Sequence, residues 1–124
     1  MAEKTERPNP FKSRWRIVSM SVRDDEYLDE EVEAFIEFKD KGEGSFQFGH
    51  VQGNIDHRAA HRGGEPAVEF SWAGGDGADG TPLTGRGWAM RKDDELHGEF
   101  LIHEGDDSEF VARRASAPKQ REGK

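Results

Sequence analysis

The chain has 124 residues, a length typical of a single domain, and it contains no cysteine. The lack of thiols excludes disulfides, thiolate catalysis and zinc ribbons, and the formal net charge of −8 disfavours binding to nucleic acid or to an anionic membrane surface. There is no apolar run long enough to span a membrane, and residues 1–12 lack the apolar segment of a signal peptide. A cytoplasmic location is therefore expected.

Both ends of the chain lack the periodicity of a folded element. Residues 1–13 and 116–124 are charged and contain proline, so we expect a flexible N-terminal arm and a flexible C-terminal tail around a folded domain of residues 14–115. The early part of that domain, from Asp24 to Glu33, is strongly acidic. It is predicted to be a solvated face, with the docking of a basic partner as the alternative.

Between the two ends, apolar and polar residues alternate with the two-residue period of half-buried β-strands. Glycine, aspartate and other turn-forming residues separate most of the runs, so sequential strands are expected to pair through short hairpins. The pattern predicts about seven or eight strands and one short helical turn over 24–31. The strands lie near 14–22, 32–39, 44–53, 54–59, 67–72, 83–91, 95–103 and 108–114.

The predicted fold is all-β, an antiparallel meander that is closed or nearly closed into a small barrel. About eight strands is the number at which side chains fill the interior of a closed barrel or leave room for one small ligand. Glycines at 49, 53, 85, 87 and 98 fall inside the strand patterns, where they indicate bends that help a small barrel to curl. The apolar strand faces give a predicted core of Trp15, Ile17, Ile36, Phe38, Phe46, Phe48, Val68, Phe70, Leu96, Phe100 and Phe110.

Several of these runs together resemble a family of small uncharacterised bacterial proteins, over about residues 14–114. That family has no assigned activity, so the resemblance implies a coherent fold and little else. The runs that carry it are Leu28-Asp29-x-x-Val32-x-Ala34-x-Ile36-x-Phe38, Phe46-x-Phe48-Gly49-x-Val51-x-Gly53, Val68-Glu69-Phe70-Ser71-Trp72, Gly85-Arg86-Gly87-Trp88-Ala89 and His103-x-Gly105-Asp106-Asp107-Ser108-x-Phe110-x-Ala112.

The layout is also similar to that of calycins, the lipocalin-like meander barrels. In that family a tryptophan near the start of the first strand packs against an arginine at the end of the last strand. Trp15 and Arg113 or Arg114 occupy such positions, although Ser13 stands where the family has a glycine. The resemblance implies the barrel architecture more than it implies ligand binding.

The candidate ligand contacts are polar and aromatic residues expected inside the barrel. His50 continues the alternation of Phe46 and Phe48, so its ring is predicted to point inward, near Ser19 and Trp72. Because an unpaired buried polar group costs about 1–3 kcal/mol, such a histidine needs a partner. The alternative to ligand contact is a structural histidine whose hydrogen bonds are satisfied near the barrel mouth.

The segment 85–89 allows two arrangements. In the first, a bulge at Gly87 turns Trp88 into the core, and this arrangement is favoured because a buried tryptophan is common. In the second, the glycines face inward and Arg86 and Trp88 lie together on the outside. Arginine and tryptophan are both favoured at binding hot spots, so this second arrangement predicts a partner or self-association surface.

No nucleophile elbow, Walker loop or HExxH motif is present, and no acidic residue occupies a predicted inward position. We therefore expect no enzyme, no metal and no cofactor. The predicted function is a non-enzymatic β-barrel module that binds a small molecule or peptide inside the barrel, with His50, Ser19, Trp72, Trp88 and Arg86 as candidate contacts. The alternative is a protein-interaction or accessory module that acts through its acidic stretch and its Arg86/Trp88 surface.

Overall fold

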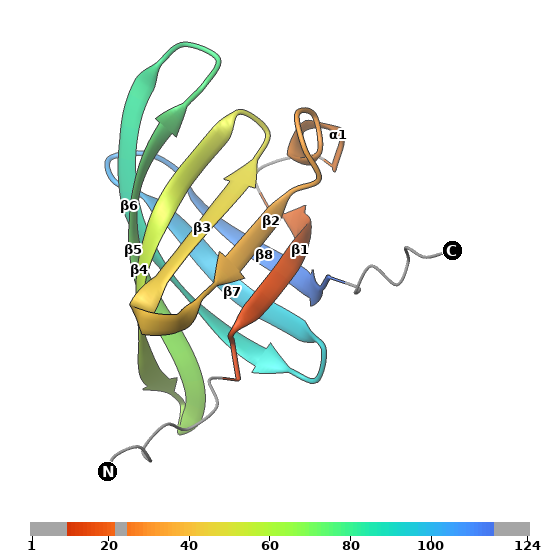
Figure 1. Cartoon of the computed structure of the whole chain (residues 1–124), viewed down its shortest axis with the longest axis vertical. Coiled ribbons are helices and arrows are strands. Elements are labelled where there is room, and N and C mark those ends of the chain that lie inside the picture. The colour runs from red at the N-terminus through yellow and green to blue at the C-terminus, as the bar shows by residue number, and fades with distance from the viewer. Residues whose placement is uncertain (1–9, 22–24, 116–124) are drawn as a thin grey trace.

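A computed structural model of the chain describes residues 10–21 and 25–115. Eight antiparallel strands form a closed barrel in which each strand pairs with the next and the last pairs with the first (Figure 1). This confirms the predicted all-β meander barrel. The strands are β1 (Ser13–Met20), β2 (Phe35–Phe38), β3 (Glu43–Phe48), β4 (Val51–Arg62), β5 (Glu65–Asp76), β6 (Thr81–Lys92), β7 (Glu95–Ile102) and β8 (Asp107–Arg114).

Two short helices lie between strands and mark the two ends of the barrel. The helix α1 (Asp25–Leu28) follows β1, and the 3-10 helix η2 (Asp40–Gly42) joins β2 to β3 (Figure 1). We call these ends the α1 end and the η2 end. Among the described residues, neither of these helices approaches the length and apolar character that crossing a membrane requires.

The chain turns at residues 49 and 50, between β3 and β4. The predicted strand over 44–53 is therefore wrong, and β4 begins at Val51 rather than at 54. Gly49 has a φ of 56°, a conformation that favours glycine, and a β-carbon at this position would overlap the ring of Tyr27. Gly49 is thus a turn residue, not the strand bend that its place in the alternating pattern indicated.

Aromatic rings fill the interior of the barrel. The ring of Phe100 lies 4.9–5.6 Å, centroid to centroid, from the rings of Phe46, Phe48, Phe70 and Phe110. Every residue of the predicted core is buried. The glycines predicted inside strands at 53, 85, 87 and 98 do lie there, and a β-carbon at each of them would meet a core aromatic ring. The rings therefore use space that the missing side chains leave free.

Trp15 closes the η2 end of the core. Its indole is fully buried, its Nε1 donates a hydrogen bond to the carbonyl oxygen of Phe11 at 3.0 Å, and the Arg114 guanidinium lies 4.9 Å from its ring centroid. Phe11 is buried and Ser13 begins β1, so the chain joins the barrel earlier than the predicted arm 1–13 allows. The remainder of that arm, and the tail 116–124, lie outside the described residues.

Candidate functional site

His50 lies in the turn between β3 and β4, outside the core. Its Nδ1 is 2.7 Å from Oε2 of Glu31, and its Nε2 is 3.6 Å from Oε2 of Glu30. The prediction that His50 points inward is wrong, because β3 ends at Phe48 and its alternation ends with it. The hydrogen bond to Glu31 is the main cause of a raised pKa of His50, and the charges of Glu31, Glu30 and Asp76 act in the same direction.

The contacts of His50 fasten the connection between β1 and β2 to the barrel. The His50 backbone N–H is 3.3 Å from the Tyr27 hydroxyl oxygen, and the Gly49 N–H donates to the carbonyl oxygen of Leu28 at 2.9 Å. Leu28 is buried at the α1 end of the core. This is the structural role that the sequence offered as the alternative for His50, found at the mouth of the barrel.

The structure does not bring Ser19 and His50 to Trp72. A register shift between Ile17 and Ser19 leaves Ser19 half-buried and places Met20 in the core instead. Trp72 is buried as predicted, and its ring packs against Phe46 at a centroid distance of 5.0 Å. Its Nε1 is buried without a hydrogen-bond acceptor among the described residues.

Trp88 lies on the outer face of the barrel. Because β6 pairs with β7 without interruption from Gly85 to Lys92, there is no bulge at Gly87, and the favoured prediction of a core Trp88 is wrong. The ring of Phe70 takes the space above Gly87. The second predicted arrangement is therefore the one found, with Trp88 half-buried and Arg86 exposed on the outside.

Two neighbours fix the orientation of the Trp88 indole. Its Nε1 donates a hydrogen bond to Oε1 of Glu99 at 3.2 Å, and the Arg62 guanidinium lies 3.7 Å from its ring centroid. Sequence reasoning missed Arg62 because the predicted strand ended at 59. The Gly63-Gly64 pair is the signal that could have revealed Arg62 as a strand residue. Two adjacent glycines are typical of a two-residue hairpin turn, and in such a hairpin the strands run up to the residues on either side of the turn.

A surface groove of about 310 Å³ runs beside Trp88 and is lined by three arginines from two strands. We call Arg58, Arg62, Arg86 and Trp88 the arginine–tryptophan face. Glu69 also lines the groove, so the face carries both signs of charge. Arg58 lies 3.8 Å from Asp56 and Arg62 stacks on Trp88, whereas Arg86 makes no ion pair or hydrogen bond through its side chain with another described residue.

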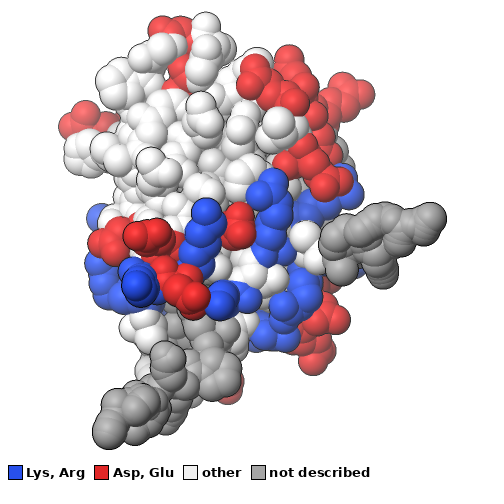
Figure 2. Space-filling view, viewed as in Figure 1, with Lys and Arg blue, Asp and Glu red and all other residues white. Residues whose placement is uncertain are grey.

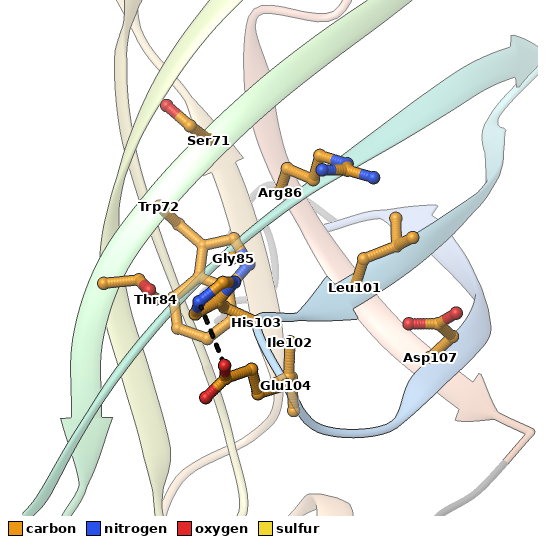
Figure 3. A pocket seen from close by; sticks show the side chains of 10 residues that line it. All are labelled: Ser71, Trp72, Thr84, Gly85, Arg86, Leu101, Ile102, His103, Glu104 and Asp107. Carbon is orange, nitrogen blue, oxygen red and sulfur yellow. Dashed lines mark ion pairs between the residues drawn. The ribbon is translucent and has the colours of Figure 1, made fainter.

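Arg86 also borders a second groove, of about 620 Å³, over β5, β6, β7 and the following loop (Figure 3). Figure 3 shows Trp72, Thr84 and His103 on one side of it and Arg86, Leu101 and Asp107 on the other. The structure thus brings together Trp72 and Arg86, two of the residues singled out from the sequence. The remaining lining residues are Ser71, Gly85, Ile102 and Glu104.

Charge is distributed unevenly over the surface. Figure 2 shows acidic side chains gathered near α1 and most lysines and arginines of that view in its lower half, towards the η2 end. Between them lies an uncharged area, where a groove of about 370 Å³ is lined by residues that include Ser45, Gln47, Gln52 and Asn54. Within the described ranges, no three His, Asp or Glu side chains gather closely enough to hold one metal ion.

Comparisons with family models, with curated proteins and with solved structures return no match for this chain. The resemblances to small bacterial proteins and to calycins therefore stay predictions. The contact between Trp15 and Arg114 is a finding about this barrel alone.

Proposed function

We propose that the chain is a non-enzymatic interaction module that binds a protein or peptide partner through the arginine–tryptophan face. The observation that carries this proposal is the outward Trp88, held between Arg62 and Glu99. Tryptophan and arginine are the residues most enriched at binding hot spots. An indole whose orientation is already fixed loses little conformational freedom when a partner packs against it.

Arg86 supplies the polar part of this surface. Its exposed guanidinium has no partner among the described side chains, and it offers a planar set of donors that suits a carboxylate. Leu101 is half-buried next to it on β7 and lines the same groove. The surface thus combines an oriented aromatic ring, an arginine without a partner among the described side chains, and a half-buried leucine.

Binding inside the barrel, the function favoured by the sequence, has less support from the geometry. Phe100 packs against four other phenylalanine rings, so an interior ligand has to displace rings that already fill the space. A barrel fold does not by itself indicate a function, because the same fold serves many unrelated functions. The absence of catalysis and the cytoplasmic location stay predictions.

The test compares stoichiometric partners captured from native cells by the full chain and by two variants, Trp88→Ala and Arg86→Ala. The control is Arg113→Ala, which removes an exposed arginine from β8, away from this face. We expect one partner that the control retains and both variants lose, while circular dichroism shows all variants folded. Equal recovery with Trp88→Ala would contradict the proposal.

The Nε1 of Trp72, which has no acceptor among the described residues, favours a second candidate function. This is the binding of a small molecule that offers a hydrogen-bond acceptor in the groove of Figure 3, which Trp72 lines. Buried polar groups in folded proteins nearly always have a hydrogen-bond partner, so we expect an acceptor for this N–H group. Native mass spectrometry of freshly purified protein tests this candidate. A co-purifying molecule that is lost from both Arg86→Ala and Trp72→Phe is expected, and a spectrum showing only the bare chain opposes it.

A further inference from the structure

The closed barrel leaves part of β4 unpaired on one side. β4 pairs with β5 along its whole length, Val51–Arg62, but with β3 only from Val51 to Asp56. Among the described residues, no strand pairs with 57–62 on that side, although the His57 side chain is hydrogen-bonded to the carbonyl oxygens of Lys39 and Glu43. These residues form an open strand edge, and Figure 1 shows the β4–β5 hairpin extending past β3 at the η2 end. Open edges are the places where another chain can add a strand.

The turn at the tip of this hairpin shows which backbone groups are free. Gly63 and Gly64 have φ values of 57° and 84°, so both residues of the two-residue turn have positive φ, and Arg62 and Glu65 flank it as a hydrogen-bonded pair. Pairing alternates along an antiparallel ladder, so the N–H and C=O of Ala59 and His61 point to the open side. Within the described residues, neither one forms a backbone hydrogen bond outside the strand ladders.

A groove of about 460 Å³ lies beside this edge. None of the described residues that line it is acidic, although the chain has 26 acidic residues against 18 basic ones. Apolar side chains and two histidines dominate the lining. It consists of Pro10, Phe11, Gly42, His57, Arg58, Ala59, Ala60, His61, Pro66, Ala67 and Val68.

We propose that the open edge of β4 accepts an extended segment of a partner protein as an added strand, in which apolar residues alternate with acidic ones. The inference rests on the proposed interaction function and names the kind of segment recognised. Side chains of an added strand point alternately to its two faces. One set would enter the apolar groove, and the other would lie beside Arg58, which lines both that groove and the groove of the arginine–tryptophan face.

A second copy of this chain fits the edge poorly. Antiparallel pairing of two β4 edges in the register that joins Ala59 of each copy to His61 of the other would place Arg58 opposite Arg62. Like charges directly across a strand pair are destabilising. An acidic segment instead gains from the same side chains, so charge complementarity selects the partner over self-pairing.

The experiment measures binding of a synthetic peptide, Ac-Glu-Val-Glu-Val-Glu-Val-NH2, to the full chain by amide NMR shifts. Two matched peptides serve as controls: one with lysine in place of glutamate, and one N-methylated at alternate residues so that it cannot form the ladder. On the protein side, Ala59→Pro removes one N–H from the open edge, where proline is tolerated. Arg113→Ala is the surface control.

We expect saturable binding of the acidic peptide, with shifts centred on residues 57–62. Loss of one or two net hydrogen bonds should weaken it about tenfold, both for the N-methylated peptide and for Ala59→Pro. The lysine peptide should not bind. The N-methylated peptide keeps the test valid even if Ala59→Pro fails to fold, because it leaves the protein unchanged.

Three results would overturn the inference: no saturable binding, binding that N-methylation leaves unchanged, or shifts of residues 57–62 that follow protein concentration alone, which would mean self-association. The proposed function fails separately. If Trp88→Ala abolishes partner capture while the peptide does not bind, the proposed interaction surface is supported and the proposed strand addition is contradicted. If the peptide binds while Trp88→Ala captures the same partners, strand addition is supported and the proposed interaction surface is contradicted.

Discussion

The ring of Phe70 lies against the α-carbon of Gly87, its cross-strand neighbour on β6. The same arrangement recurs where Trp72 lies over Gly85 and where Phe110 lies over Gly98. Only 32% of the residues in this chain are hydrophobic. Because large rings lie over glycines, a small number of hydrophobic residues fills the interior. A binding partner is therefore expected on the outer face of the barrel.

The Phe70–Gly87 contact predicts the cost of adding one methyl group. Gly87→Ala should lower the free energy of unfolding by about 1–3 kcal/mol, because the new β-carbon overlaps both the ring and the strand backbone. Gly77→Ala, in the loop before β6, is the control and should change little, since the nearest atom to its β-carbon lies at an ordinary 3.5 Å. Urea denaturation measures both. Equal stabilities of the two variants would contradict the packing described.

Phe100 is the central ring of the core. Phe100→Ala should cost about 3–5 kcal/mol, as expected for a buried phenylalanine, out of about 5–15 kcal/mol for a typical domain. A large fall in the urea midpoint, or a chain that no longer folds, is the expected outcome. An unchanged midpoint would mean that the interior is not filled by this ring.

The three tryptophans should respond differently to truncation. Trp15→Ala removes a fully buried ring and should cost about 3–5 kcal/mol. Trp88→Ala removes an outer ring with one hydrogen bond and one stacked arginine, so about 1–2 kcal/mol is expected. Thermal melts followed by circular dichroism compare them. Unfolding of the Trp88 variant at the temperature of the Trp15 variant would place Trp88 in the core after all.

His50 gives the barrel a pH-dependent contribution to stability. The Glu31 carboxylate favours the protonated ring, so the folded-state pKa lies above the ordinary value of 6.5. The contribution is then fully present below about pH 6.5, the value for the unfolded chain, and is lost as the pH rises through the folded-state pKa.

The Tm gap between the natural chain and His50→Gln should therefore be wider near pH 6 than near pH 8.5, by the linkage between protonation and folding. Glu31→Gln removes the main cause of the shift and serves as the control, since in that background the pH dependence of the gap should shrink. A gap that widens with rising pH would contradict the ion pair.

The two-residue period alone predicts the core and the approximate places of most strands, because burial on one face of a sheet imposes that period whatever the neighbours. It does not locate the turn at residues 49 and 50. Phe46, Phe48 and His50 continue one alternation, and only the positive φ of Gly49 shows where it breaks. The alternating pattern also gives no sign of the register shift after Ile17. For this reason the pattern predicts the wrong face for Ser19.

The candidate site was less predictable, because it depends on contacts between distant strands. Trp72 points into the barrel as predicted, but nothing in the sequence shows that its Nε1 lacks an acceptor among the described residues. The stacking of Arg62 on Trp88 joins β4 to β6, two strands that are not sequential neighbours. The outward position of Trp88 depends on whether β6 contains a bulge, which local sequence does not decide.

Hydroxyl-radical footprinting of the tryptophans, in the free chain and with its captured partner, tests most directly whether binding occurs on the outer face. Trp88 should be oxidised in the free chain and protected by the partner, while the buried Trp15 and Trp72 should react little in either state. Strong oxidation of Trp72 in the free chain that the partner suppresses, with Trp88 unchanged, would contradict binding on the outer face and place the binding site inside the barrel.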